Sequence, residues 1–280
     1  MKIGFQGRHG TFSEIAALSY FSTQEIEPCG YPNFKLILED VQNGVLDYAL
    51  LPVENTTTGI ISRTYDLLCH YDIHVIGEID IPIHEDLIVV PGTKIEEISE
   101  VYSHPEALLQ CSGFFAEHPE IKSMSFQDTA RSVEYIRDCN DRSKAALGSW
   151  RAREYYGMES LIRNVQDNDL NMTRFFAVSA KKEVAADADK ISMMIVLKHE
   201  PGTLYRALGI LNDQKINILK LESRPIRGRV FEYMFYIDFS GNMNDENVEK
   251  AVRALQESSE ESKLMGCYKA AVPFHQEKAI

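Results

Sequence analysis

Four short segments of the chain combine residue types that bind anions or transfer protons. They are a glycine-rich turn at residues 4–14, a polar run at 51–59, and the segments 103–110 and 171–178. Each lies where an apolar, strand-like run meets a turn or a helix. Because ligands of open α/β sheets bind at the ends of strands, these segments are the candidates for a binding or catalytic site.

In the first segment, a strand passes through Gly4, Gly7 and Gly10 into a helix that begins at Thr11. Free backbone N–H groups at a helix start attract anions, and glycine lets a ligand come close. Gly10 and Thr11 are therefore candidate ligands of an anion. Thr11 and Glu14 also form the pattern of an ordinary helix cap, and the two interpretations are compatible.

In the second segment, Asn55 and Thr56 begin a run of polar residues after an apolar strand, so they could bind a polar substrate. A threonine-rich helix cap is the alternative.

In the third segment, Ser103 and His104 end a strand, and Gln110 lies one to two turns into the following helix. Because a single histidine at a strand end is more often a cap than a base, His104 is not assigned a catalytic role.

The fourth segment begins with Asn171, Thr173 and Arg174 and continues as an apolar strand from Phe175. The planar guanidinium of Arg174 matches a carboxylate, and the Thr173 hydroxyl is its neighbour in the chain. On these grounds alone the segment is a strand with a polar start.

Two further patterns are weaker. His70 and His74 have a spacing used for metal binding, but they span the passage from a helix to a strand, so we expect no metal site there. Cys111 has no activating partner nearby in the sequence, which favours a structural thiol.

The elements that position these residues follow from hydrophobic periodicity. Strands and helices alternate over the first 180 residues, which predicts α/β layers, arranged as two lobes with a cleft between them. Residues 179–190 lack apolar periodicity and indicate a linker. The rest follows the order βαββαβ, a ferredoxin-like plan. Expected strands are 2–5, 48–53, 74–78, 87–90, 101–103, 145–148, 171–178, 191–197, 218–223, 232–239 and 263–271; expected helices are 11–21, 34–43, 59–69, 105–117, 129–138, 202–214 and 245–257.

Composition narrows the class of protein. The 280 residues carry 29 Lys and Arg against 42 Asp and Glu, so the formal charge is −13. No basic cluster suits nucleic acid, and the acidity disfavours anionic membranes. Five cysteines without CxxC spacing favour free thiols in a reducing compartment. With no signal peptide or membrane-spanning run in the sequence, we expect a cytoplasmic protein.

Taken together, these segments resemble the motifs of the prephenate dehydratase family, in the same order and over nearly the whole chain. Residues 7–14 resemble the first motif, 52–68 the second and 103–111 the third. Residues 171–175, Asn-Met-Thr-Arg-Phe, resemble the family's Thr-Arg-Phe segment. Residues 222–225, Glu-Ser-Arg-Pro, resemble the phenylalanine-responsive motif of an ACT domain.

The resemblance implies a catalytic domain at 1–180 with two lobes like those of periplasmic binding proteins, and an ACT regulatory domain at 191–271. It implies conversion of prephenate to phenylpyruvate, with loss of carbon dioxide and water, in L-phenylalanine biosynthesis and without a metal or organic cofactor. The catalytic residues that it implies are Thr173, Asn55 and Gln110. The substrate-binding residues that it implies are Gly10, Thr11, Thr56, Ser103, Arg174 and Phe175.

The ACT resemblance implies feedback inhibition by L-phenylalanine, bound between the subunits of a homodimer or homotetramer. Thr203 and Tyr205 depart from the alanine and valine that are usual there, and Thr56 replaces a frequent serine in the catalytic part. The residues implied for phenylalanine binding are Gly202, Thr203, Leu204, Glu222, Ser223, Arg224 and Pro225.

Two alternatives stay open at this point. The first is the same chemistry on arogenate, the aminated analogue of prephenate. The second is a protein of another class, a non-catalytic two-lobed small-molecule-binding protein with an amino-acid sensor domain.

Overall fold

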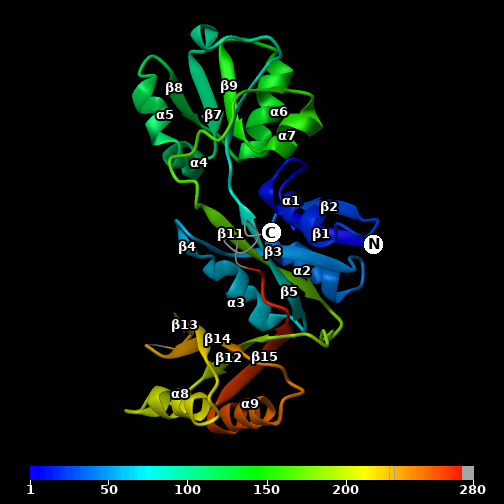
Figure 1. The fold of residues 1–280 in the computed structure, drawn as a ribbon, viewed down its shortest axis with the longest axis vertical. Coiled ribbons are helices and arrows are strands. Elements are labelled where there is room, and N and C mark those ends of the chain that lie inside the picture. The colour runs from blue at the N-terminus through cyan, green and yellow to red at the C-terminus, as the bar shows by residue number, and fades with distance from the viewer. Residues whose placement is uncertain (227, 230, 273–280) are drawn as a thin grey trace.

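A computed structural model describes residues 1–226, 228–229 and 231–272, which form three parts stacked along the long axis of the molecule (Figure 1). A first lobe lies in the middle, with a second lobe on one side of it and the C-terminal domain on the other. The expected α/β fold with two lobes and a ferredoxin-like domain is confirmed.

The first lobe is a sheet in the order β5-β11-β3-β1-β2, with β4 paired to β3. Alternation along β11 sends Phe175 into the core under α1 and Phe176 into the core under α2 and α3. Its elements are β1 (Lys2–Gln6), α1 (Phe12–Tyr20), β2 (Glu27–Tyr31), α2 (Phe34–Gln42), β3 (Tyr48–Asn55), β4 (Gly59–Ile60), α3 (Ser62–His70), β5 (His74–Pro82) and β11 (Met172–Ser179).

The second lobe is a sheet in the order β10-β6-β9-β7-β8, inserted between β5 and β11. Two crossovers, residues 83–85 and 163–171, join the lobes. The helix expected at 105–117 is interrupted at Cys111, so it forms two short helices. The elements are β6 (Asp86–Val89), η1 (Ile95–Glu97), β7 (Glu100–Ser103), α4 (Pro105–Gln110), α5 (Ser112–Glu117), β8 (Lys122–Ser125), α6 (Thr129–Cys139), β9 (Lys144–Gly148), α7 (Trp150–Tyr156) and β10 (Glu159–Ile162).

The C-terminal domain has the sheet order β13-β14-β12-β15, with α8 and α9 packed on one face. Its other face shares a hydrophobic core with the first lobe, in which Met194, Tyr236 and Tyr268 join Tyr65 and Leu68 of α3. The elements are β12 (Lys190–Val196), α8 (Thr203–Asp213), β13 (Ile218–Pro225), β14 (Tyr233–Ser240), α9 (Glu246–Ser258) and β15 (Glu261–Tyr268).

The sheets of the first lobe and the C-terminal domain are continuous, because β15 pairs with β5 at Gly266 and Val75. Glycine is required here, since a Cβ atom on Gly266 would lie 2.2 Å from the carbonyl oxygen of Val75. The expected linker was 179–190; its two end residues belong to β11 and β12, and residues 180–189 between them contain no helix or strand. None of the helices that the structure describes is long and apolar enough to cross a membrane.

Candidate active site

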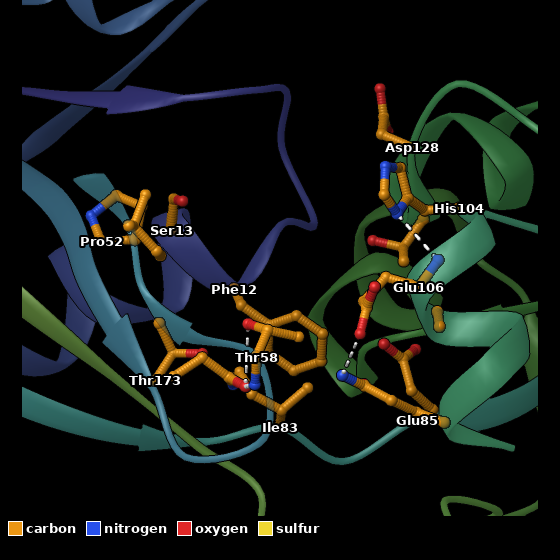
Figure 2. Close-up of a pocket in the computed structure, with 15 residues that line it drawn as sticks. Phe12, Ser13, Pro52, Thr58, Ile83, Glu85, His104, Glu106, Asp128 and Thr173 are labelled. Atoms are coloured by element: carbon orange, nitrogen blue, oxygen red, sulfur yellow. Dashed lines mark hydrogen bonds between the residues drawn. The ribbon is translucent and has the colours of Figure 1, made fainter. Parts of the chain in front are cut away.

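A cleft of about 380 Å³ separates the two lobes. Figure 2 shows Thr173, Thr58 and Ser13 on the side of the first lobe and His104 and Glu106 on the side of the second. Glu85, on the crossover between β5 and β6, lies on the side of Glu106. The residues that line the cleft are Phe12, Ser13, Pro52, Asn55, Thr58, Ile61, Ile83, Glu85, His104, Glu106, Ala107, Gln110, Asp128, Thr129 and Thr173.

A bulge in β3 brings Asn55 beside Thr173. Along β11, Arg174 pairs with Glu54, but the next residue pairs with Pro52, so Val53 has no partner in this register. An extra residue reverses the alternation of a strand, and Asn55 therefore faces the cleft together with Thr173. The Nδ2 atom of Asn55 donates a hydrogen bond to the Thr173 Oγ1 atom at 3.0 Å.

A network of amides holds this pair and extends across the lobes. Asn55 Nδ2 also donates to Asn171 Oδ1 at 2.8 Å, while its own Oδ1 accepts from the backbone N–H groups of Thr57 and Thr58. Asn171 Nδ2 in turn donates to Gln110 Oε1 at 3.0 Å. The Thr173 oxygen accepts this hydrogen bond from Asn55, and none of the described residues accepts the proton of the hydroxyl, so the proton can be donated into the cleft. The three expected catalytic residues are thus brought together.

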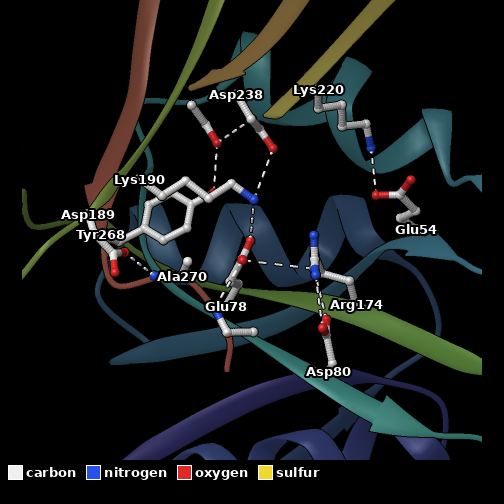
Figure 3. A network of polar contacts seen from close by, with 12 residues as sticks. Glu54, Glu78, Asp80, Arg174, Asp189, Lys190, Lys220, Asp238, Tyr268 and Ala270 are labelled. Atoms are coloured by element: carbon white, nitrogen blue, oxygen red, sulfur yellow. Dashed lines mark hydrogen bonds and ion pairs between the residues drawn. The ribbon is translucent and has the colours of Figure 1, made fainter. Parts of the chain in front are cut away.

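Arg174 does not reach the cleft, although it was the expected carboxylate ligand. It follows Thr173 on β11 and therefore points to the opposite face, towards the C-terminal domain. Its Nε and Nη2 atoms donate to the two carboxylate oxygens of Asp80, each at 2.8 Å (Figure 3). These hydrogen bonds raise the pKa of Arg174 despite its burial, so the guanidinium is charged and committed to Asp80.

The Arg174 pair belongs to an ionic network that joins the first lobe to the C-terminal domain. Glu78 lies 3.9 Å from Arg174 Nε and accepts a hydrogen bond from Lys190 Nζ at 2.8 Å. Lys190 lies on β12 and also pairs with Asp238 of β14 at 3.1 Å. The Lys190, Glu78 and Asp238 side chains are at most 5% exposed. The strand that carries Thr173 is therefore linked to the C-terminal domain through Glu78 of β5.

Three other expected substrate ligands also have structural roles. The Ser103 hydroxyl is buried and donates to the carbonyl oxygen of Leu147, which fastens β7 to β9. The Thr56 hydroxyl bridges the ends of the second crossover and β11, where it accepts from the Met172 N–H and donates to the Leu170 carbonyl. Phe175 is 2% exposed and packs in the core under α1.

The glycine-rich turn forms a contact between the lobes. The Gly10 N–H donates to Glu14 Oε2 at 2.6 Å, so it is not free for a ligand. Gly10 has a φ of +96°, and a Cβ atom there would lie 2.7 Å from the Ala152 Cα atom of α7. Thr11 caps α1 as expected and borders an outer extension of the cleft.

Glu14 is fully buried at this contact. Burial opposes its ionisation, but hydrogen bonds from Gly10 and His9 and the nearby Arg151 cation together hold the pKa of Glu14 below its ordinary value. Because Arg151 belongs to α7, the turn of the first lobe is joined to the second lobe by charge as well as by packing.

His104 acts as a helix cap, the role favoured by the sequence, because its Nδ1 atom accepts a hydrogen bond from the Glu106 N–H. Sequence reasoning did not assign six other polar residues to the cleft, which are Ser13, Thr58, Glu85, Glu106, Asp128 and Thr129. Glu106 and Thr129 were expected only as residues at the starts of helices. Ser13 and Thr58 stood within the candidate segments. Glu85 and Asp128 had no distinguishing pattern, since each resembles an ordinary polar residue of a connection.

Among the residues that line the main cleft there is no lysine or arginine. Arg8 and Arg131 border its outer extension, which also contains Thr11, Ser13 and Thr129. No group of three or more His, Cys, Asp or Glu side chains within the described part of the chain could hold a metal ion. The binding chemistry of the cleft is thus that of amides, hydroxyls and carboxyls, with cations at its mouth.

Comparison with known families agrees with this geometry. The family model described as prephenate dehydratase matches residues 3–183, more than half of the chain. The chain belongs to the prephenate dehydratase family. A second family model, the ACT domain, matches residues 192–257.

Curated relatives of this family match almost the whole chain. A bifunctional chorismate mutase/prephenate dehydratase from Enterobacter agglomerans is 36% identical over 271 residues, which are 95% of this chain and 70% of the relative. An arogenate dehydratase/prephenate dehydratase from Arabidopsis thaliana is 35% identical and is covered over 72% of its length, with 96% of this chain.

Two solved structures superpose closely on this chain. The prephenate dehydratase from Arthrobacter aurescens in complex with L-Phe has a TM-score of 0.87 and 27% identity, covering 96% of this chain and 90% of its own. A protein described as GqqA, a novel type of quorum quenching acylase, has a TM-score of 0.88 and 28% identity, covering 98% and 100% of the two chains. Both agree with the fold described above.

The residues implied for phenylalanine binding fall into two places of the C-terminal domain. Gly202, with a φ of +83°, precedes α8, and the Thr203 hydroxyl donates to the carbonyl oxygens of Lys198 and Glu200. Leu204 packs against the core of this domain. Residues 222–225 lie on β13, the outermost strand of the sheet, where Arg224 contacts Asp66 of the first lobe.

Proposed function

We propose that this chain is a prephenate dehydratase, which converts prephenate to phenylpyruvate with loss of carbon dioxide and the ring hydroxyl. Membership of the family supports the reaction. The observation that carries the assignment to this cleft is the 3.0 Å hydrogen bond from Asn55 to the Thr173 hydroxyl at its wall. The family assignment favours an enzyme over a non-catalytic two-lobed binding protein.

In this proposal Thr173 donates the proton that the departing hydroxyl needs. A threonine hydroxyl is a weak acid, so proton transfer must accompany cleavage of the C–O bond. The hydrogen bond from Asn55 stabilises the charge that develops on the Thr173 oxygen. Gln110 and Asn171 keep Asn55 in place. Formation of an aromatic ring supplies the driving force, and the scheme uses no metal or organic cofactor.

Arg174 is replaced as the candidate ligand of the substrate carboxylates. Arg8 and Arg131 are the cations at the mouth of the cleft, and each already has an acidic neighbour, Glu134 and Asp128 respectively. We assign them the attraction of a dianionic substrate, which a protein of net charge −13 otherwise repels. Ser13 and Thr129, which line both the extension and the main cleft, then offer hydroxyls to the substrate.

The direct test is the phenylpyruvate assay on Thr173 variants. Thr173→Ala removes the donor and is expected to lower kcat by about 100-fold or more, while Thr173→Ser keeps a hydroxyl and retains part of the rate. Near-normal turnover by the alanine variant, with an unchanged unfolding transition, would remove Thr173 from the mechanism.

The preference between prephenate and arogenate is a second question, since curated relatives include enzymes named for either substrate. We favour prephenate, and kcat/KM measured for both compounds decides it. A higher value for arogenate would reverse the assignment.

The free cysteines suit a reducing compartment, and we place the reaction in the cytoplasm.

We propose that the C-terminal domain binds L-phenylalanine between two copies in a homodimer or homotetramer and that binding inhibits catalysis. The ACT family match and the solved relative in complex with L-Phe support this. Leu219 and Leu221 on the outermost strand, and Tyr205 on α8, are exposed apolar side chains suited to pairing. Calorimetry that detects no phenylalanine binding, or binding without inhibition, contradicts the regulatory part.

A further inference from the structure

Glu85 is a buried carboxyl group that the proposed mechanism does not use. It lies on the crossover between the lobes, and its residue is only 2% exposed, yet it lines the cleft. Its backbone N–H donates to Gln166 Oε1 at 2.9 Å, and its carbonyl oxygen accepts from the Val165 N–H at 2.8 Å. The second crossover therefore holds Glu85 of the first crossover in place at the cleft wall.

The surroundings of Glu85 cannot support a negative charge. Its Oε2 atom is buried and has no hydrogen-bond partner among the described residues. Asp86, next in the chain, is the charged group that acts on Glu85, and the Cys111 thiol after α4 is close enough for the charge of Glu85 to raise its pKa. The ionisable groups that line the cleft with Glu85 are Glu106, Asp128 and His104, whose Nδ1 atom accepts a hydrogen bond as the cap of α4. Since the cleft wall contributes no lysine or arginine, a proton is the remaining way to neutralise the group.

The direction of the acidity agrees with this geometry. Burial, and then the negative charge of Asp86, raise the pKa of Glu85 from an ordinary 4.5 to about 8. At pH 7 the group is therefore a neutral carboxylic acid, which can donate a hydrogen bond.

We propose that Glu85 binds the substrate as a neutral carboxylic acid and donates a hydrogen bond to the carboxylate-bearing end of its ring. The inference rests on the proposed function. The hydroxyl and the carboxylate that leave prephenate are attached at opposite ends of the ring, and Figure 2 shows Thr173 and Glu85 on opposite sides of the cleft. A substrate that presents its hydroxyl to Thr173 therefore presents its carboxylate end to Glu85.

A neutral donor suits decarboxylation better than a cation does. An arginine at this position would bind the carboxylate strongly before the reaction, and that stabilisation would be lost as the carboxylate becomes neutral carbon dioxide. A carboxylic acid orients the same group with a weaker hydrogen bond. An ionised Glu85 would instead repel the substrate, so the protonated form is the active form.

The test is the pH dependence of kcat/KM for prephenate in wild-type enzyme and in Glu85→Gln, whose amide keeps the shape and a permanent neutral donor. The wild-type value is expected to fall above about pH 8, approaching tenfold per pH unit, as one proton is lost. Glu85→Gln should stay within a few-fold of wild type at pH 7 and show no such fall. Glu85→Leu, which has no donor, should lose about 10- to 100-fold at pH 7.

A second variant moves the titration without touching the group. Asp86→Asn removes the neighbouring charge while keeping an oxygen for the Ser160 hydroxyl, so the alkaline fall should shift to lower pH. The proposal is overturned if Glu85→Gln loses as much activity as Glu85→Leu, or if it keeps the wild-type alkaline fall. If wild-type enzyme forms no phenylpyruvate at any pH, the proposed function fails instead.

Discussion

Replacing Glu85 by glutamine should stabilise the protein, by an amount that depends on pH. In the unfolded chain this carboxyl loses its proton above its ordinary pKa of 4.5, whereas in the folded protein it keeps the proton until about pH 8. The folded state of wild type thus binds more protons between these values, and its stability falls as pH rises through this window. Glutamine does not titrate, so residue 85 causes no loss of folding stability with rising pH in the variant.

The size of the effect follows from the shift. From 4.5 to 8 is about 3.5 pKa units, and at roughly 1.4 kcal/mol per unit the stabilisation of Glu85→Gln over wild type is about 4 kcal/mol at pH 8 and approaches about 5 kcal/mol at higher pH. At pH 7, which is about 2.5 units above the ordinary pKa of 4.5, the expected gain in stability is roughly 3 kcal/mol. At pH 4.5 and below it is close to zero, because both proteins then carry a neutral side chain.

Urea unfolding at pH 5, 6, 7 and 8 measures the difference, with fluorescence of the single tryptophan, Trp150 of α7, as the probe. Other groups titrate equally in both proteins and cancel in the comparison. The reasoning is refuted if the difference between the two unfolding free energies changes by less than about 1 kcal/mol from pH 5 to pH 8. This measurement needs no substrate, so it tests the neutral carboxyl separately from catalysis.

Three further outcomes are expected. Lys190→Met leaves the buried Glu78 without its closest cation and should lower the free energy of unfolding by about 3–5 kcal/mol; a loss near zero would show that water reaches the network. Gly10→Ala adds a Cβ atom against Ala152 at a positive φ and should destabilise by roughly 2 kcal/mol, measured by thermal unfolding, whereas an unchanged transition would mean that the lobes separate easily. Asn55→Ala should lower kcat for phenylpyruvate formation by about 100-fold, with a smaller change in KM, and an unaltered kcat would argue against support of Thr173 by Asn55.

Much of the fold was predictable because its central strands and amphipathic helices have clear periodicity. The elements that were missed are mainly at sheet edges: β2, which contains Pro28 and Gly30, the polar strand β8, and β10. Edge strands need little hydrophobic pattern, since one side of each is unpaired. The seven-residue helix α7 is too short for its period to show. The break at Cys111 was missed because Gly113, the nearest residue that weakens a helix, lies inside the second helix and not at the break.

The site was predictable only in part. Thr173, Asn55 and Gln110 do meet at the cleft, although the bulge that turns Asn55 into it has no marker in the sequence. The absence of Arg174 from the cleft could have been predicted from the sequence. Adjacent residues of a strand face opposite sides, so only one of Thr173 and Arg174 can enter the cleft. Glu85 could not have been found, since its burial depends on how two distant crossovers pack together.

The core shared by the first lobe and the C-terminal domain limits how the protein can be divided. Removing the C-terminal domain by cutting the chain between residues 180 and 190 would remove Met194, Tyr236 and Tyr268, which pack against α3 in the shared core. The severed catalytic fragment would then present Tyr65 and Leu68 to water and tend to aggregate. Deletion of the C-terminal domain, which would remove the proposed feedback control, is therefore expected to cause loss of the enzyme itself, and variants that escape the proposed inhibition should instead come from point substitutions.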